Sequence, residues 1–185
     1  TWYEDETSLE AVDYPIHEYD LTASPNDFNV RTLFDFIIRG TVHIPGFQRN
    51  FVWDIKRSSK LIESLIIGLP IPQIFLYEEK RNSFLIIDGQ QRLMSIYYFI
   101  TGRFPKKEKR VELRKIFETE GKIPDEILYN DTFFTKFNLN LPTQIPNQKN
   151  KFHSLNYETL EDSQSAFDLR PIRSVIVKQV SPDGD

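Results

Sequence analysis

Apolar and polar positions alternate along the chain in two periods, which predict a regular succession of helices and strands. Helical spacing of apolar residues predicts helices over residues 30–39 and 90–101, and a third helix that starts after Asp54 or Ser58 and ends at Gly68. Shorter apolar runs predict strands over residues 41–44, 73–77 and 83–87, with a turn over 78–82. Because strands and helices alternate, we expect one compact α/β or α+β unit.

The pattern continues more weakly in the second half of the chain. It predicts an amphipathic helix over residues 108–118, a short helix over 124–128 and a returning strand over 172–180. Residues 141–151 are rich in Asn, Gln, Pro and Lys and are expected to form a loop.

Composition narrows the class of protein. The chain has 185 residues, of which 39% are hydrophobic and 14% aromatic, as expected for one folded domain. It has no cysteine, which excludes a disulfide framework, a thiol nucleophile and cysteine-ligated zinc. No apolar stretch reaches the roughly 20 residues that span a bilayer, so we expect a cytoplasmic protein with no membrane partner.

Charge is distributed unevenly. Residues 1–28 hold eight acidic and no basic residues, whereas the rest of the chain holds 23 basic and 19 acidic residues. We therefore predict an acidic N-terminal arm over residues 1–28 and a mildly basic domain over 29–185. The arm is either a solvated leader or a segment that covers a basic surface. Because the chain starts without Met and stops soon after a predicted strand, we expect a fragment of a longer protein.

The segment from Asp88 to Arg92, with sequence Asp-Gly-Gln-Gln-Arg, carries the strongest chemical signal. It follows an apolar strand and begins the helix at Gln90. Backbone N-H groups and the positive end of a helix dipole meet at such a point, which favours phosphate binding. Arg92 opposes the dipole in the first helical turn, so its position suggests a negative ligand.

The last four residues of this segment suit contacts with phosphate. Gly89 permits close backbone approach, and Gln90 and Gln91 supply N-H donors. Arg92 and Arg49 supply guanidinium groups that bind phosphate through two N-H groups. The alternative for Arg92 is a surface ion pair.

Asp88 cannot bind phosphate directly. Three roles fit its carboxylate: it caps the helix, it holds a Mg2+ that bridges phosphates, or it orients the attacking water.

A second cluster of cations lies at the start of the predicted helix that ends at Gly68, and it contains Arg49, Lys56, Arg57 and Lys60. Gln48 and Arg49 lead through an aromatic loop that contains Phe51 and Trp53. These aromatic side chains suit core packing or base stacking, and Gln48 and Arg49 suit either phosphate binding or hydrogen bonds to their own loop. Residues 45–110 hold 12 basic and 6 acidic residues, so positive charge gathers around both helix starts.

Four motifs in order carry a resemblance to a known family. They are Ile-Pro-Gly-Phe-Gln-Arg-Asn-Phe-Val-Trp (44–53), Leu-Ile-Glu-Ser-Leu (61–65), Pro-Ile-Pro-Gln-Ile-Phe-Leu-Tyr (70–77) and Ile-Asp-Gly-Gln-Gln-Arg-Leu (87–93). Together they resemble the N-terminal domain of the GmrSD-type restriction endonuclease family, which is known for a DGQQR motif. The resemblance is dense over the core, residues 30–104, and implies an α+β ParB/sulfiredoxin-like fold, a compact mixed sheet with flanking helices.

The resemblance also implies a function. It points to a nucleoside triphosphate (NTP) with Mg2+, bound and hydrolysed by a domain that regulates an HNH-type nuclease domain, in cis or in trans. The setting is modification-dependent restriction or another anti-phage defence system, with DNA as a partner of the full-length protein. The chain has no HNH cluster and no cysteine for sulfiredoxin chemistry, so neither of these activities is expected of it.

These arguments give one set of site residues and three functional hypotheses. Asp88 and Arg92 are the expected catalytic residues, with Asp88 as the metal ligand. The expected nucleotide-binding residues are Gln48, Arg49, Gly89, Gln90, Gln91 and Arg92. The first hypothesis is an NTPase of this regulatory type. The second is a ParB-like DNA-binding or nuclease domain that uses the same arginines on DNA phosphates, and the third is a binding scaffold.

Overall fold

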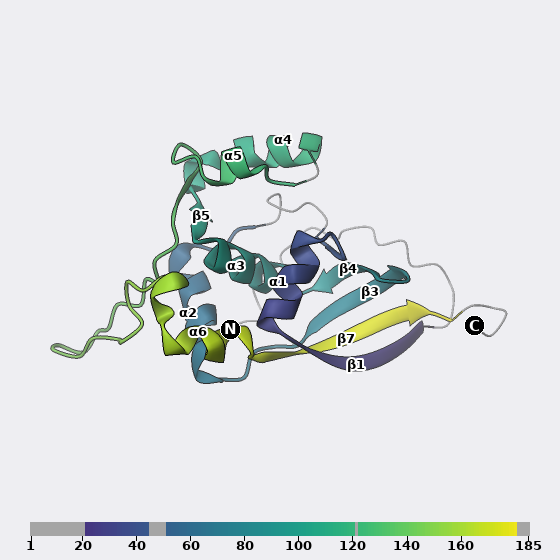
Figure 1. Ribbon diagram of the computed structural model, residues 1–185, viewed down its shortest axis with the longest axis horizontal. Helices are drawn as coiled ribbons and strands as arrows, with labels where there is room; N and C mark the ends of the chain where they lie inside the picture. The colour runs from purple at the N-terminus through teal and green to yellow at the C-terminus, as the bar shows by residue number, and fades with distance from the viewer. Residues whose placement is uncertain (1–20, 45–50, 121, 181–185) are drawn as a thin grey trace.

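A mixed five-stranded sheet forms the base of the molecule in the computed structural model, which describes residues 21–44, 51–120 and 122–180 (Figure 1). The strand order is β1-β7-β3-β4-β2. The strands are β1 (Leu21–Asn29), β2 (Val42–His43), β3 (Ile74–Lys80), β4 (Ser83–Asp88) and β7 (Pro171–Gln179).

The sheet combines antiparallel and parallel pairs. The longest pair is antiparallel and joins β1 to β7 along its whole length, from Leu21 opposite Gln179 to Asn29 opposite Pro171. β3 runs parallel to β7 and antiparallel to β4, and β2 runs parallel to β4. Together with the helices this mixed sheet confirms the predicted α+β class.

Helices α1 (Val30–Ile38), α2 (Ile55–Ile67), α3 (Gln90–Thr101) and α6 (Asp162–Asp168) pack beside the sheet. The sequence defines where they start, because Asn29 and Asp54 accept backbone N-H bonds at the N-termini of α1 and α2. Helix α3 packs against both α1 and α2, and its residues 90–99 are all buried. The helix that carries the Asp-Gly-Gln-Gln-Arg segment is therefore the central helix of the fold.

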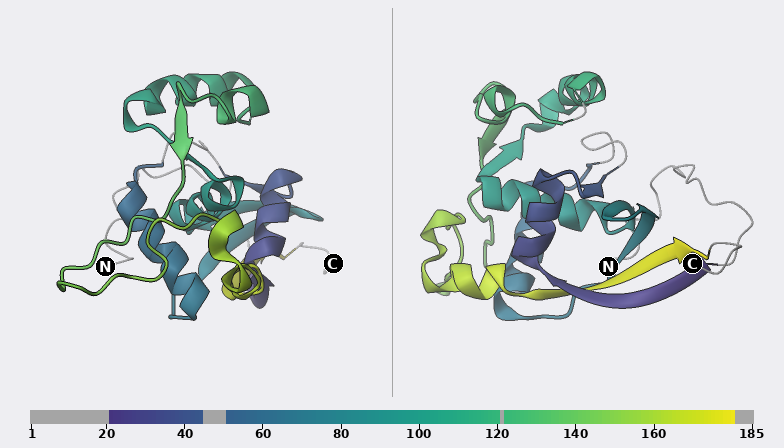
Figure 2. Two further views of the ribbon diagram at one scale, coloured as in Figure 1. Left: turned by 60° about the vertical axis from the view of Figure 1, so that its left-hand side comes forward. Right: turned by 45° about the vertical axis from the view of Figure 1, so that its right-hand side comes forward.

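A smaller lobe rises from the end of α3, away from the sheet (Figures 1 and 2). It consists of the paired strands β5 (Arg103–Pro105) and β6 (Phe134–Lys136), a short 3-10 helix, η1 (Lys107–Lys109), and helices α4 (Arg110–Glu120) and α5 (Asp125–Leu128). Buried Arg103 joins these parts, since it donates hydrogen bonds of 2.8 Å to the Leu128 carbonyl and to the Asp131 carboxylate. A second 3-10 helix, η2 (Glu158–Leu160), precedes α6.

Most predicted elements are present, with several differences. The predicted bounds of α3 are confirmed, whereas β3 continues to Lys80, through the first part of the predicted turn. Residues 21–28, which the charge pattern assigns to the acidic arm, form most of β1. The sequence analysis did not predict β1, β5, β6 or α6. None of the helices in the described part of the chain is long and apolar enough to cross a membrane.

Candidate functional site

The predicted site lies where β4 passes into α3, and residues 88–92 are called the α3 junction below. Asp88 ends β4, Gly89 is the N-cap residue, and Gln90 begins the helix. Because its N-cap residue is a glycine, the helix has no side-chain cap from that residue. The junction thus has the strand-to-helix form that the sequence predicts.

Gly89 is required at this position for two reasons. Its φ angle of +104° lies in the region that favours glycine. A Cβ atom added there would lie 2.6 Å from Cγ2 of Ile74 on the neighbouring strand β3. The absence of a side chain therefore lets the end of β4 turn into α3 while it packs against β3.

Arg92 is a buried residue of the junction and is bound to the protein backbone. Its side chain is only 1% exposed. Nη1 donates to the Pro72 carbonyl at 2.6 Å, Nη2 donates to the Gln73 carbonyl at 3.5 Å, and Nη2 lies 3.9 Å from Oδ2 of Asp88. The guanidinium thus holds the segment before β3 against the start of α3, and it is not the surface ion pair that the sequence left open.

The two glutamines are also buried. Oε1 of Gln91 accepts hydrogen bonds from the backbone N-H groups of Val52, at 3.0 Å, and Trp53, at 3.3 Å. Gln91 therefore fixes the segment before α2 to the start of α3. Oε1 of Gln90 is buried and has no hydrogen-bond partner among the described residues. Such an acceptor is costly unless a donor reaches it.

Asp88 is the accessible member of the junction. Its side chain is 39% exposed, in contrast to that of Arg92. Because Gly89 is the N-cap residue and makes no side-chain bond, Asp88 does not have the capping role that the sequence left open. In the described ranges 21–44, 51–120 and 122–180, no group of three or more His, Asp or Glu side chains could hold a metal ion. A Mg2+ at Asp88 would therefore need ligand oxygens from substrate phosphates and water, which is common for Mg2+.

Gln48 and Arg49, the other predicted nucleotide contacts, lie outside the described residues. The segment that follows them is held on both sides. Gln91 binds its N-H groups, and Arg110 of α4 donates to the Phe51 carbonyl at 3.1 Å and to the Trp53 carbonyl at 2.8 Å. Residues 51–53 thus connect the α3 junction with the smaller lobe.

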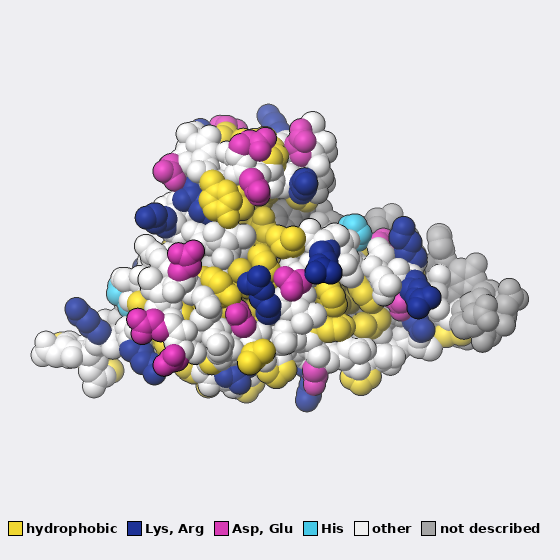
Figure 3. Space-filling view, viewed as in Figure 1, with side chains coloured by type: hydrophobic (Ala, Val, Ile, Leu, Met, Phe, Trp, Pro, Cys, Tyr) yellow, Lys and Arg dark blue, Asp and Glu magenta, His cyan; other side chains and the backbone are white. Residues whose placement is uncertain are grey.

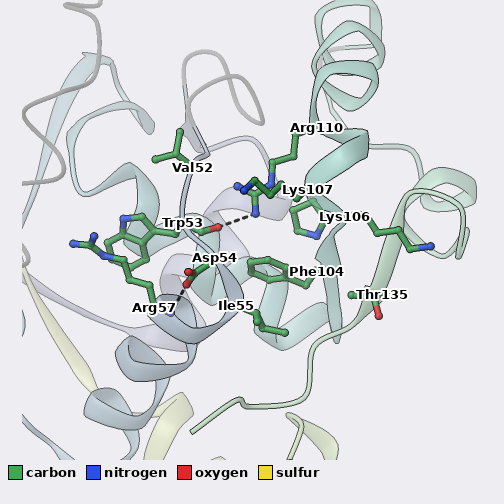
Figure 4. Close-up of a pocket in the computed structure, with 11 residues that line it drawn as sticks. Val52, Trp53, Asp54, Ile55, Arg57, Phe104, Lys106, Lys107, Arg110 and Thr135 are labelled. Atoms are coloured by element: carbon green, nitrogen blue, oxygen red, sulfur yellow. Dashed lines mark hydrogen bonds between the residues drawn. The ribbon is translucent and has the colours of Figure 1, made fainter. Parts of the chain in front are cut away.

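A cavity of about 600 Å³ opens beside this segment, between the start of α2 and the β5–α4 region (Figure 4). We call it the basic cavity, because four cationic residues and one acidic residue line it. Its charged lining residues are Arg57, Lys106, Lys107, Arg110 and Asp54. None of residues 88–92 lines it, so it is distinct from the α3 junction.

The guanidinium groups of the basic cavity are partly removed from water. Burial lowers the pKa of Arg57, and burial also lowers the pKa of Arg110, against the opposing effects of Tyr98 and Asp54. Both side chains lie over aromatic rings: Cζ of Arg57 is 4.7 Å from the Trp53 ring centroid, and Cζ of Arg110 is 5.0 Å from that of Phe51. Desolvated guanidinium groups interact more strongly with anions than hydrated ones do.

The sequence shows that these cationic residues are present, but it does not predict that they line one cavity. All four belong to the excess of basic residues over 45–110. Arg57, however, lies some 50 residues before Lys106, Lys107 and Arg110 in the chain, so the sequence alone does not bring them together. Trp53 and Phe51 are each 2% exposed, and the Phe51 ring packs edge-on against Tyr98 and Phe104. The aromatic residues therefore follow the core-packing alternative, with the cations placed above them.

A second cavity, of about 990 Å³, lies between the end of α1, β2 and the α4–α5 segment. Hydrophobic side chains gather on the surface below the smaller lobe in Figure 3, with charged groups of both signs around them. The residues that line this second cavity include His43, Lys122, Asp125 and Glu126. This mixed charge gives it no preference for an anion.

The protein is thus a mixed α+β domain whose candidate site lies where a strand turns into a helix at a glycine. Comparison with known families gives its identity: residues 30–180 match the GmrSD restriction endonuclease, N-terminal domain, and the chain belongs to this family. The family places the domain in the context of DNA restriction. The resemblance predicted from the motifs is thereby confirmed, and it extends beyond the core of residues 30–104.

One relative of the chain is a protein without a stated activity. An uncharacterized protein of Methanocaldococcus jannaschii, MJ0686, is 29% identical over 126 residues, which cover 50% of this chain and 22% of the relative. The match thus spans about a fifth of that protein's length. No solved structure gives a significant match to the chain.

Proposed function

We propose that this domain binds a nucleoside triphosphate at the α3 junction and hydrolyses it with Mg2+, as a regulatory domain of a restriction or anti-phage defence protein. The observation that carries the proposal is the half-exposed carboxylate of Asp88 directly before an α-helix whose N-cap residue is a glycine. Membership in the GmrSD family supports the defence context.

The chemistry follows from the charges at the junction. The start of α3 carries a partial positive charge that favours phosphate oxygens. The Asp88 carboxylate would hold a Mg2+ that also binds those oxygens, so that the metal neutralises charge developing on the transferred phosphoryl group.

The arginines would act in different ways. Arg92 is engaged with backbone carbonyls, so we assign it the role of shaping the junction and of holding Asp88 in place through their 3.9 Å ion pair. Direct contact with phosphate then falls to the guanidinium of Arg49 and the side-chain amide of Gln48. Both precede the segment that Gln91 fixes to α3, which brings their chain neighbours to the same helix start.

Phosphate release from NTP tests this proposal. With Mg2+ present we expect turnover by the wild type, and we expect Asp88→Asn to lower it at least tenfold, since the amide is a poorer Mg2+ ligand. Removal of Mg2+ with a chelator should abolish turnover. The matched control is Glu79→Gln on the exposed end of β3, which should leave turnover unchanged. Full turnover by Asp88→Asn would refute the catalytic role of this carboxylate.

A second candidate function, binding to DNA, is favoured by the basic cavity. DNA and an HNH-type nuclease domain, in cis or in trans, are the partners that the restriction context supports. DNA binding does not compete with the first function, because the two sites use different residues.

A further inference from the structure

We infer that the smaller lobe controls the affinity of the α3 junction for nucleotide, and that Gln91 and Arg110 are the positioning residues that connect the two. The inference rests on the proposed function for its ligand, the nucleoside triphosphate. It adds a distant part of the fold to the determinants of binding, because Arg110 begins α4 and lines a cavity that none of residues 88–92 lines. The connection runs through residues 51–53, which are called the linking segment below.

The linking segment is held from two sides by side chains of different parts of the fold. On the α3 side, Oε1 of Gln91 accepts the N-H groups of Val52, at 3.0 Å, and Trp53, at 3.3 Å. On the lobe side, the Arg110 guanidinium donates to the carbonyl of Phe51, at 3.1 Å, and to that of Trp53, at 2.8 Å (Figure 4). Trp53 thus has its N-H bound on one side and its carbonyl on the other, so a shift of either partner moves the same stretch of backbone.

Aromatic packing joins the same three parts. The Phe51 ring packs edge-on against Tyr98 of α3 and Phe104 of β5, with ring centroids 5.1 Å and 5.7 Å apart. Cζ of Arg110 lies 5.0 Å from the Phe51 centroid and 5.7 Å from that of Phe104. Phe51 and Trp53 are each 2% exposed. Closely packed side chains transmit a displacement to their neighbours, so a movement of the lobe reaches the linking segment.

Gln91 is the residue through which the linking segment reaches the α3 junction. Its side chain is fully buried, and it lies in the first turn of α3, where the free backbone N-H groups favour phosphate. A displacement of the linking segment therefore changes how the start of the helix is oriented. Misplacement of binding groups by about 1 Å can cost roughly a hundredfold in rate, so a small displacement is enough.

The lobe has room to shift relative to the rest of the fold. The basic cavity separates it from the start of α2, and the second cavity separates the α4–α5 segment from the end of α1 and β2. The chain enters the lobe at Gly102, where an added Cβ would have no heavy atom within 4 Å. Because energetic coupling between two sites is reciprocal, nucleotide at the junction should in turn hold the lobe more firmly.

The experiment compares the wild-type 185-residue chain with one test variant and two controls. The test variant is Arg110→Met, which removes the lobe's hold on the linking segment. The first control is Arg114→Met, which makes the same change of charge and size one turn later on α4 and has no hydrogen bond to residues 51–53 within the described ranges. The second control is Gly40→Ala, which should lower stability by a similar amount through its φ angle of +74°, away from the linking segment.

Two quantities are measured at a temperature where all four proteins are folded. The first is the dissociation constant of each Mg2+-nucleotide among ATP, GTP, CTP and UTP, by calorimetry. The second needs no nucleotide: it is the rate of amide hydrogen exchange at Val52 and Trp53, whose N-H groups bind Gln91 rather than Arg110. This rate reports whether release of the lobe loosens the bonds on the opposite side of the segment.

We expect Arg110→Met to bind nucleotide at least about fivefold more weakly than the wild type and to exchange these two amides faster by a similar factor. Both controls should match the wild type in both quantities. Unchanged nucleotide affinity in Arg110→Met would overturn the inference, and so would equal losses in all three variants, which indicate loss of charge or of stability alone.

The exchange rates separate this inference from the proposed function. If the wild type binds none of the four nucleotides, NTP binding at the junction is refuted. Faster exchange at Val52 and Trp53 in Arg110→Met alone would then still support the connection between the lobe and the α3 junction. Equal exchange in all four proteins would overturn that connection, whether or not nucleotide binds.

Discussion

The α3 junction and the basic cavity differ in what their cationic side chains contact. At the α3 junction Arg92 is 1% exposed and donates to backbone carbonyls of residues 72 and 73. At the basic cavity Lys106 and Lys107 lack carboxylate partners among the described residues, and Lys107 is exposed. The motif arginine is thus part of the internal structure, whereas less conspicuous lysines face the solvent.

Arg92, the basic residue of the motif, is therefore less accessible to a ligand than the lysines of the basic cavity. A buried guanidinium that satisfies two carbonyls fixes the shape of a site, and that shape then presents an accessible group, here Asp88. Cations with partly exposed side chains remain free to exchange water for phosphate.

The largest stability effect is expected for Arg92→Met. The substitution leaves the carbonyls of Pro72 and Gln73 without their guanidinium donors in a buried region, so the free energy of unfolding should fall by about 4 kcal/mol. Urea denaturation measures this loss. Arg81→Met at the exposed β3–β4 turn is the control and should change stability by less than about 0.5 kcal/mol. Similar values for both variants would mean that Arg92 is not a structural residue.

Gly89→Ala should destabilise the junction by about 3 kcal/mol. Part of this cost is the unfavourable positive φ angle, and part is the contact of the new Cβ with Ile74 on β3. Gly40→Ala separates the two contributions, because Gly40 also has a positive φ, +74°, but has no heavy atom within 4 Å of the added Cβ. We expect Gly40→Ala to cost about 1 kcal/mol in the same denaturation assay. Equal costs would show that the close approach to Ile74 is unimportant.

The smallest of these stability effects is expected for Arg110→Met at the wall of the basic cavity. Arg110 also donates to two backbone carbonyls, but it is only partly buried, so water can replace part of what is lost. We expect a loss of about 1 to 2 kcal/mol in thermal or urea unfolding. Lys109→Gln, which removes a surface pair with Glu112, provides a control near zero. A loss as large as that of Arg92→Met would remove the distinction between the two regions.

Elements with strong periodicity could be predicted from the sequence, and those that depend on distant partners could not. Helix α3 was predicted with its bounds because its apolar residues recur at helical spacing and Gly102 ends it. Strand β1 was missed because most of its residues are exposed and it contains Pro25, so neither alternation nor β propensity marks it. Its pairing with β7, some 150 residues later, is what makes it a strand.

The same limit applies to the candidate site. The strand-to-helix form of residues 88–92 follows from local sequence, including the need for a glycine. The burial of Arg92 does not, because its partners, the carbonyls of residues 72 and 73, reach it through the packing of β3 against β4. The basic cavity likewise depends on bringing Arg57 opposite Lys106 and Lys107, which only the tertiary fold determines.

The most direct test of NTP binding at the α3 junction is a thermal-shift titration with ATP, GTP, CTP and UTP, with and without Mg2+. It should compare the wild type, Asp88→Asn and the control Glu79→Gln. Ligand at about 100 times its dissociation constant stabilises by roughly 2.7 kcal/mol, a measurable shift. We predict a Mg2+-dependent shift for at least one nucleotide in the wild type and in Glu79→Gln, and its loss in Asp88→Asn. No shift with any nucleotide, or an equal shift in all three proteins, would contradict the assignment.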